Sequence, residues 1–270
     1  MNKSIRNTGR TAVPLLLGIL LLSGCATYQH PDFNARHAKI HSIAIIPSSV
    51  EVYRLSFKGD KDPMHDASAE ANQVAGDEIA SLMKQKGYAV RPMDLSEEAL
   101  TGKPELRTAW HTTNELFLKI LGDIQKGRKG KTPYTLGVDV NILADHAQAD
   151  SLVFMTGEGI KKTGGEITQE VILSALFGTP IRPSETLAQL AVVDSNTGEI
   201  LWVNRNSNVA INPADPAQVR SMVRDILQIF PKSAAEQSRE KSKKKERQEQ
   251  VAQPTHNFGA RAPLTPPVTP

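Results

Sequence analysis

The residue with the clearest chemical capacity in this sequence is Cys25, the single cysteine among 270 residues. A deprotonated thiol is a strong nucleophile, so one cysteine in a defined context can be a site of covalent modification. Residues 1–10 carry three basic residues and no acid, and residues 11–22 form a short apolar run. This order, followed by small Ser23 and Gly24, predicts a secretory signal peptide, because the run is shorter than the ~20 apolar residues of a membrane-spanning helix.

Residues 22–25, LSGC, resemble the lipobox of bacterial lipoproteins. The resemblance implies that signal peptidase II removes residues 1–24 and that Cys25 carries a diacylglycerol thioether and an amino-linked acyl chain such as palmitate. Such acyl chains anchor a protein stably, because each buried CH₂ contributes about 0.8 kcal/mol. Ala26 and Thr27, with no aspartate after the cysteine, favour by the same resemblance the periplasmic face of the outer membrane of a Gram-negative cell. An ordinary signal peptide with an incidental cysteine is the alternative.

The basic pI of the full chain suggests nucleic-acid binding, but the charge of the mature chain argues against it. The full chain has a net charge of +3, but three of its 32 Lys and Arg residues lie in residues 1–24, which leaves 29 basic against 29 acidic residues. The segment from residue 233 onward holds seven basic and four acidic residues, so residues 25–232 have a net charge of −3. Residues 25–232, which we call the body, therefore have no excess of basic side chains that would bind a polyanion.

Hydrophobic periodicity predicts alternating strands and helices. Strands are expected at 39–50, 50–57, 88–92, 151–159, 186–194 and 199–206, and helices at 66–87, 104–126, 138–147 and 215–230, while 166–177 suits a helix or a strand. The apolar run 43–46, stopped by Pro47, predicts a central strand buried on both faces. A hairpin is expected around Gly198, and Asp66 and Asp215 are expected to cap helices. This order predicts an α/β (α+β) fold, a layered single domain with a mixed β-sheet flanked by helices.

Three stretches resemble one group of periplasmic lipoprotein folds. Residues 43–47, IAIIP, resemble the opening strand of the curli-secretion lipoprotein CsgG and of the LpoB-type activators of penicillin-binding proteins, whose fold the TolB amino-terminal domain shares. Residues 149–157 and 190–202 resemble two later segments of that group, and a related lipoprotein family of this layout matches equally well. The resemblance covers roughly residues 40–230. It implies a TolB-N/CsgG-like fold, an envelope location and a binding or assembly role.

The chain is therefore expected to contain four segments. These are a lipoprotein signal peptide at 1–24, a tether at 25–38, a periplasmic α/β domain at 39–232, and a disordered charged and Pro-rich tail at 233–270. The tail is assigned as disordered because it has almost no apolar content. Residues 95–131 form a longer insert than the resemblance leads us to expect.

Two groups of residues suggest ligand-binding chemistry, and each has a plainer explanation. His30, His37 and His41 include a pair four residues apart, but that spacing brings imidazoles together only on a helix, and this segment leads into a strand. Exposed tether histidines without a metal are therefore expected. The glycines of residues 157–159 and 164–165 match no phosphate-binding motif, so a turn at a strand end is expected.

Charged residues give two more candidate sites. Asp139, Asp145, Asp150 and Glu158 are candidates for the paired carboxylates of a glycan hydrolase, although acids at helix ends and turns are common. The basic run 241–245 suits contact with anionic lipid, peptidoglycan carboxylates or an acidic partner, but the interleaved glutamates favour a solvated tail.

These observations favour a non-catalytic accessory or assembly factor for a cell-envelope complex, serving secretion, transport or peptidoglycan synthesis. It would have a lipid anchor and protein partners, and no cofactor, metal or nucleic acid. An envelope enzyme acting on peptidoglycan or another glycan, and a self-assembling secretion-channel component, are the alternatives. An accessory factor should show an exposed apolar patch or an open strand edge, at the hairpin or in residues 95–131, whereas an enzyme should show a cleft with converging carboxylates.

Overall fold

The apolar run at residues 43–46 forms strand β2 (Ser42–Ile45), which lies inside the sheet. The structure is a computed structural model that describes residues 28–56, 60–126, 133–162, 184–206 and 211–252. β2 pairs in parallel with β5 (Ala89–Pro92) and β6 (Ser151–Lys162). Its successive side chains alternate between two separate core clusters, as a strand requires. The prediction of a central strand buried on both faces is confirmed.

Strand β6 has two parallel partners in succession. Its first part pairs with β2, and its second part pairs with β3 (Ser49–Leu55). The break between β2 and β3 falls at Pro47, which has no N–H to donate to a ladder. β4 (Lys61–Pro63) pairs with the outer edge of β3. β6 also continues to Lys162, so the strand is longer than predicted.

The predicted hairpin is formed by β7 (Ser184–Asp194) and β8 (Ile200–Asn206), and β7 pairs antiparallel with β6. Gly198 in the turn has a φ of +67°, and a Cβ there would lie 2.1 Å from the Gly137 carbonyl oxygen. Only glycine permits both this backbone conformation and this approach.

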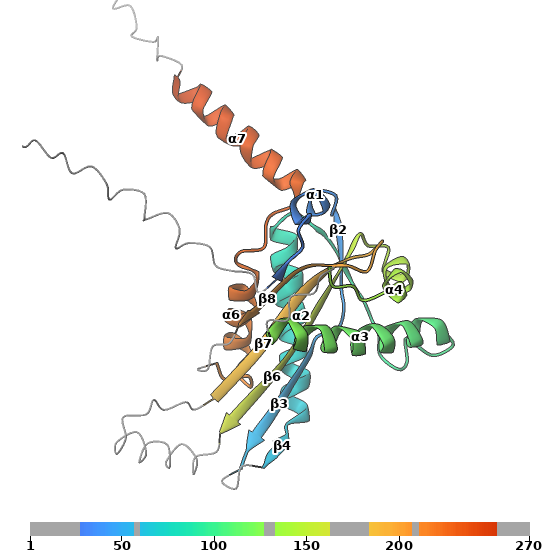
Figure 1. The fold of residues 1–270 in the computed structure, drawn as a ribbon. Helices are drawn as coiled ribbons and strands as arrows, with labels where there is room; N and C mark the ends of the chain where they lie inside the picture. The colour runs from blue at the N-terminus through green and yellow to red at the C-terminus, as the bar shows by residue number, and fades with distance from the viewer. Residues whose placement is uncertain (1–27, 57–59, 127–132, 163–183, 207–210, 253–270) are drawn as a thin grey trace, which may run out of the picture.

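Helices cover both faces of the sheet (Figure 1). One face packs on α2 (His65–Gln85) and α6 (Pro216–Leu227), and the other on α3 (Pro104–Gln125) and α4 (Asp139–Ala147). The Asp215 side chain accepts a hydrogen bond from the Ala217 N–H at 2.9 Å and caps α6 as predicted. Asp66 does not cap α2, because Met64 occupies the cap position and Asp66 lies in the first turn. The described chain is thus a single layered α/β domain with a mixed eight-stranded sheet, as predicted.

The prediction of a tether at residues 25–38 is wrong for residues 28–38, which fold onto the rest of the body. β1 (Tyr28–Gln29) pairs antiparallel with β8, and α1 (Phe33–His37) follows it. Phe33 is buried in the core cluster with α2 and α6, which explains why this segment packs on the body. Cys25 lies outside the described residues.

The C-terminal segment also differs from the prediction, because residues 234–252 form helix α7 (Ala234–Ala252), which projects from the body (Figure 1). The Ser233 hydroxyl accepts a hydrogen bond from the Glu236 N–H at 3.2 Å and so caps this helix. The rest of α7 consists mostly of Ala, Glu, Gln, Lys and Arg, which are strong helix formers. Residues 253–270 and the ambiguous segment 166–177 lie outside the described residues.

Candidate functional site

The described structure begins three residues after the predicted lipidation site. A chain spans at most about 3.3–3.6 Å per residue, so the Cα atom of Tyr28 lies within about 11 Å of that of Cys25. Tyr28 is already part of the folded body, because it pairs with Val203 and its ring contacts the Tyr134 ring at a centroid distance of 5.1 Å. Within the described residues, no helix is long and apolar enough to cross a membrane.

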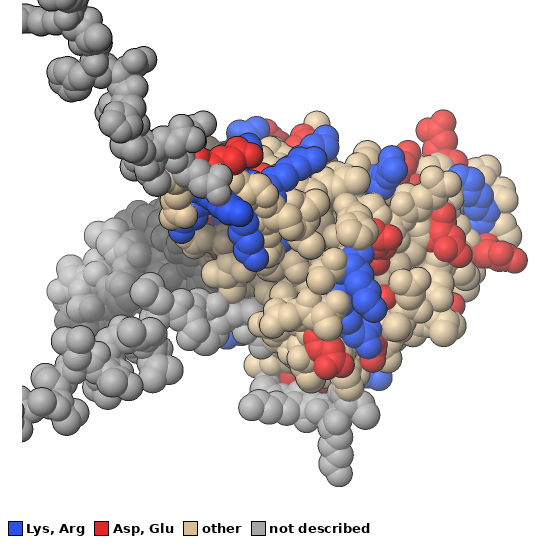
Figure 2. Space-filling model, turned by 90° about the horizontal axis from the view of Figure 1, so that it is seen from above, with Lys and Arg blue, Asp and Glu red and all other residues tan. Residues whose placement is uncertain are grey.

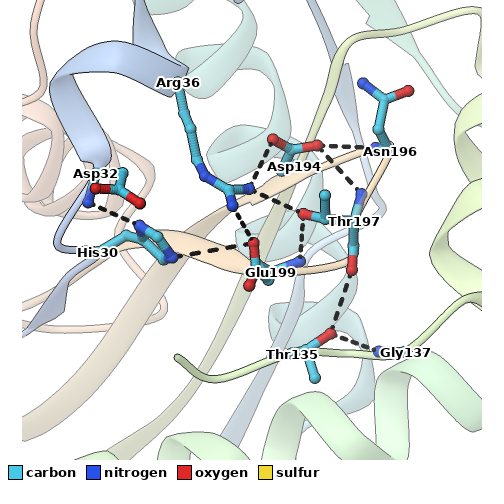
Figure 3. A network of polar contacts seen from close by, with 9 residues as sticks. All are labelled: His30, Asp32, Arg36, Thr135, Gly137, Asp194, Asn196, Thr197 and Glu199. Carbon is cyan, nitrogen blue, oxygen red and sulfur yellow. Dashed lines mark hydrogen bonds and ion pairs between the residues drawn. The ribbon is translucent and has the colours of Figure 1, made fainter. Parts of the chain in front are cut away.

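Arg36 of α1 fixes the N-terminal segment to the hairpin turn (Figure 3). One guanidinium nitrogen lies 2.5 Å from a Glu199 carboxylate oxygen, and another lies 3.3 Å from Asp194 and donates to the Thr197 hydroxyl at 3.1 Å. The second oxygen of Asp194 accepts a hydrogen bond from the Asn196 N–H at 2.9 Å, which shapes the turn. We call Arg36, Asp194, Thr197 and Glu199 the N-terminal clamp.

The three histidines have separate environments. His30 is buried, and its Nδ1 accepts from the Asp32 N–H at 3.0 Å, while Nε2 lies 3.9 Å from Glu199 (Figure 3). His37 is also buried, so the prediction of exposed tether histidines is wrong for both, whereas His41 is exposed. Among the described residues, no three His, Cys, Asp or Glu side chains form a group able to hold a metal ion.

His37 belongs to an aromatic cluster centred on Phe230. The Phe230 ring lies 5.0 Å from Trp202, 5.7 Å from His37, 6.0 Å from Tyr88 and 6.3 Å from Phe33, between ring centroids. A hydrogen bond of 2.5 Å joins His37 Nε2 to the Tyr88 hydroxyl. Burial lowers the pKa of His37 and raises the pKa of Tyr88. The cluster connects the N-terminal segment to the residues that lead into α7.

The Tyr88 hydroxyl donates its proton to the Pro231 carbonyl at 3.1 Å, so in the bond with His37 it accepts from Nε2. Lys86 donates to the Phe230 carbonyl at 2.6 Å, and the Ser233 N–H donates to the Lys86 carbonyl at 2.8 Å. The base of α7 is therefore attached to the loop between α2 and β5.

The four predicted carboxylates are not brought together. Asp150 accepts hydrogen bonds of 2.9–3.0 Å from the backbone of His41 and Ser42 and from the Ser42 hydroxyl. Burial alone would raise the Asp150 pKa, but these hydrogen bonds outweigh it and lower the pKa. Glu158 lies seven positions beyond Ser151 on the same strand, about 23 Å away. Asp139 and Asp145 lie on α4, so the four residues are spread over α4, the residue before β6 and the second part of β6.

Two glycines of the predicted strand-end turn lie inside β6 instead. A Cβ at Gly159 would lie 2.3 Å from the Pro213 side chain, and one at Gly157 would lie 2.8 Å from the Leu187 carbonyl oxygen. Close packing therefore accounts for both glycines. Residues 164–165 lie outside the described residues.

Neither the hairpin edge nor the basic run forms a distinct binding site. β1 covers β8 at Trp202 and Val203, and Thr135 bridges to Glu199, so this part of the edge is closed. The basic run 241–245 lies on exposed α7. Figure 2 shows basic and acidic side chains interspersed over the face seen from above, with no field of a single sign.

A groove of about 310 Å³ lies between α3 and the strands β3, β6 and β7. We call it the α3 groove. Its lining residues are Ser49, Glu51, Leu118, Leu121, Gly122, Gln125, Thr156, Gly157, Glu158, Leu187 and Gln189. Glu158 and Gly157 were singled out in the sequence, and the four lining residues of α3 lie in residues 95–131, where a contact surface was expected. The lining residues of β3 and most of those of β6 and β7 were missed. The glycine inside the helical pattern at Gly122 was a visible signal.

No protein-family model matches this chain, and no curated protein matches it. Among solved structures, it is similar to lipoprotein GNA1162 from Neisseria meningitidis, with 14% identity over 62% of this chain and 78% of that chain and a TM-score of 0.30. It is also similar to the PelC dodecamer from Paraburkholderia phytofirmans (12% identity, 73% and 91% covered, TM-score 0.31). A third similar structure is the LpoB C-terminal domain from Salmonella enterica (12% identity, 62% and 82% covered, TM-score 0.26). At these values the similarities carry no argument about function.

Proposed function

We propose that this chain is a lipoprotein, acylated at Cys25 and held at the periplasmic face of the outer membrane, that acts as a non-catalytic accessory or assembly factor for a cell-envelope complex. The observation that carries this proposal is the packing of residues 28–38 on the body immediately after the lipobox-like sequence. The N-terminal clamp and the Phe33 side chain hold this segment in place. A lipid on Cys25 would therefore hold the folded domain close to the membrane surface.

The arrangement of the described side chains favours an accessory factor over an enzyme. The four candidate carboxylates are not gathered at one site, and Asp150 is occupied by backbone donors. Glu158 does lie beside Glu51 in the α3 groove, but it is paired with Lys61. Leu118 and Leu187, by contrast, are exposed and line the same groove. Exposed apolar side chains around one groove are typical of a contact surface.

Lipidation is tested by expressing the chain with its own signal sequence in a Gram-negative host. Mass spectrometry of the mature protein should show an acylated Cys25, and fractionation should place the protein in the outer membrane. Cys25→Ser should stay unlipidated and unprocessed. Ser23→Ala keeps the lipobox pattern and serves as the control that should mature normally. Normal maturation and outer-membrane retention of Cys25→Ser would refute the anchor.

A further inference from the structure

We propose that the α3 groove is the docking site for an extended segment of a partner protein, which places a lysine or arginine side chain at Glu51 and Glu158. Aliphatic side chains on either side of that basic residue would contact the exposed leucines of the groove. The proposal deepens the accessory role, on which it rests, by assigning the contact surface and the chemistry of the partner.

The apolar part of the groove comes from two different elements. Leu118 on α3 is 47% exposed and Leu187 on β7 is 36% exposed, and both line the groove. Single exposed leucines are ordinary on a protein surface. Two that face one groove from a helix and a strand provide apolar contacts for a bound segment.

The floor of the groove holds a buried amide oxygen that has no partner among the described residues. Gln189 is only 5% exposed, and its Oε1 atom has no hydrogen-bond partner in the part of the chain that the structure describes. Leaving a buried acceptor unpaired is energetically unfavourable. A rotation of this side chain on binding would let a backbone N–H group of the bound segment supply the missing donor.

Charge gives the groove a preference for a cation. Glu51 and Glu158 are register partners on β3 and β6, so their side chains lie on the same face. The Tyr53 hydroxyl donates to Glu51 and Lys61 pairs with Glu158, and the lining residues together carry two negative charges and no positive charge. The Lys61 pair is exposed, and such pairs contribute little to stability, so it presents little obstacle to a second cation.

The neighbouring strand β8 carries a positive charge just beyond the groove floor. Arg205 on β8 is the register partner of Gln189 and therefore lies on the same face of the sheet. A basic group of the partner would be repelled there, so it belongs at the Glu51 and Glu158 end.

Gly122 makes the groove accessible. It lies within α3 and lines the groove, and a Cβ at this position would meet no heavy atom within 4 Å. A glycine inside a helix is less favourable than alanine, and no close packing in the described structure requires it here. The groove volume is at the low end of the range for ligand sites, which suits a few side chains of a docked segment.

The test uses the Cys25→Ser form of the full chain, which stays unprocessed and is purified in mild detergent, so its result does not depend on lipidation. The protein is titrated calorimetrically with two acetylated and amidated heptapeptides, one alternating leucine with lysine and the other alternating leucine with glutamate. We expect the lysine peptide to bind at least about tenfold more tightly. Replacing both carboxylates, with Glu51→Gln and Glu158→Gln, should reduce that preference to about threefold or less.

A pair of glycine variants locates the binding site. Gly122→Met fills the groove and should weaken binding of the lysine peptide at least about tenfold. Gly76→Met is the matched control, because Gly76 lies in α2 and a Cβ there also meets nothing within 4 Å. Thermal unfolding should show that both variants fold, since methionine is a better helix former than glycine.

Three outcomes would overturn the docking proposal. They are equal affinity for the two peptides, unchanged binding by Gly122→Met, and no binding of the lysine peptide by the protein without groove substitutions. If the lysine peptide binds as expected but Cys25 is not acylated in cells, the lipid anchor is refuted and the groove is retained.

Discussion

Arg36 is the single side chain that contributes most to the position of the N-terminal segment. Its guanidinium contacts Glu199, Asp194 and Thr197, and only about a quarter of the Arg36 side chain is exposed. Charge-assisted hydrogen bonds in such partly buried sites are stronger than those between exposed groups. Nothing in the sequence alone pairs Arg36 with a turn about 160 residues away, so this contact could not be predicted.

Arg36→Gln should lower the free energy of unfolding by about 1–3 kcal/mol, because the variant loses charge-assisted hydrogen bonds and leaves two carboxylates without their partner. Chemical denaturation measures this change, and hydrogen exchange should show faster exchange in residues 28–38. Arg220→Gln is the control, because Arg220 is an exposed α6 residue and should change stability by less than about 0.5 kcal/mol. Equal losses in the two variants would show that the clamp does not stabilise the fold.

The buried His37 predicts a pH dependence of stability. Burial lowers the pKa of His37 in the folded state, whereas the unfolded chain should titrate near pH 6.5. Below about pH 6.5 the unfolded state therefore binds a proton that the folded state does not, and stability falls by up to about 1.4 kcal/mol per pH unit. The loss ends once the pH is below the folded-state pKa.

Denaturation midpoints between pH 7.5 and 5 measure this effect. His37→Gln should show a shallower decline of stability with falling pH than the unsubstituted chain. His146→Gln, at an exposed position on α4, should leave the decline unchanged. Parallel curves for all three proteins would contradict a buried neutral His37.

At the scale of elements, the sequence predicted those whose apolar side chains repeat with a clear period. β5, α2, α3, α4, the β7–β8 hairpin and α6 all lie close to their predicted ranges, whereas β2 is shorter than the predicted strand at 39–50. β1 and α1 were missed because only a few apolar residues, such as Tyr28 and Phe33, hold them to the body. α7 was missed because a helix without an apolar face has no period, although Ser233 three residues before Glu236 is a cap signature.

The candidate groove could be predicted only in part. Gly122 was visible in the sequence as a glycine within a helical pattern. Its place opposite Glu51 and Gln189 depends on how α3 crosses the sheet, which periodicity does not determine.

The connection between α2 and α7 gives a prediction at this scale. Gly87, predicted to end the helix of residues 66–87, has a φ of +87°, and a Cβ there would lie 2.6 Å from the Ser233 hydroxyl and 2.7 Å from the Glu236 Cβ. Gly87→Ala should therefore lower the free energy of unfolding by the backbone strain of about 1–2 kcal/mol and further by a clash at the base of α7. Hydrogen exchange should show a less protected first turn of α7.

Gly102→Ala is the matched control for this prediction. Gly102 has a similar φ of +75°, but a Cβ there meets nothing within 4 Å. Gly102→Ala should be destabilised only by the backbone strain, and the protection of α7 should stay unchanged. Equal destabilisation by the two substitutions would show that Gly87 does not support the attachment of α7.

At the scale of the whole molecule, the clamp and the α3 groove lie at opposite ends of the same sheet. Asp194 of the clamp pairs with Ser151, whereas the groove contains Glu158 of the same strand, about 23 Å further along. The N-terminal segment forms the edge strand β1, which pairs with β8 (Figure 1). Lipidation and partner docking would therefore use separate surfaces of one domain.

The central claim is that a membrane-anchored domain acts through a protein partner, and in-cell crosslinking tests it most directly. Tagged forms of the unsubstituted chain, Cys25→Ser and Gly122→Met would be crosslinked in growing cells, purified in mild detergent and analysed by mass spectrometry. We expect one envelope protein to recur with the unsubstituted chain and to be lost or strongly reduced with both variants, while Gly76→Met retains it. Recovery of the same protein at equal yield from all forms, or of no protein together with glycan-cleaving activity of the purified chain, would contradict the account.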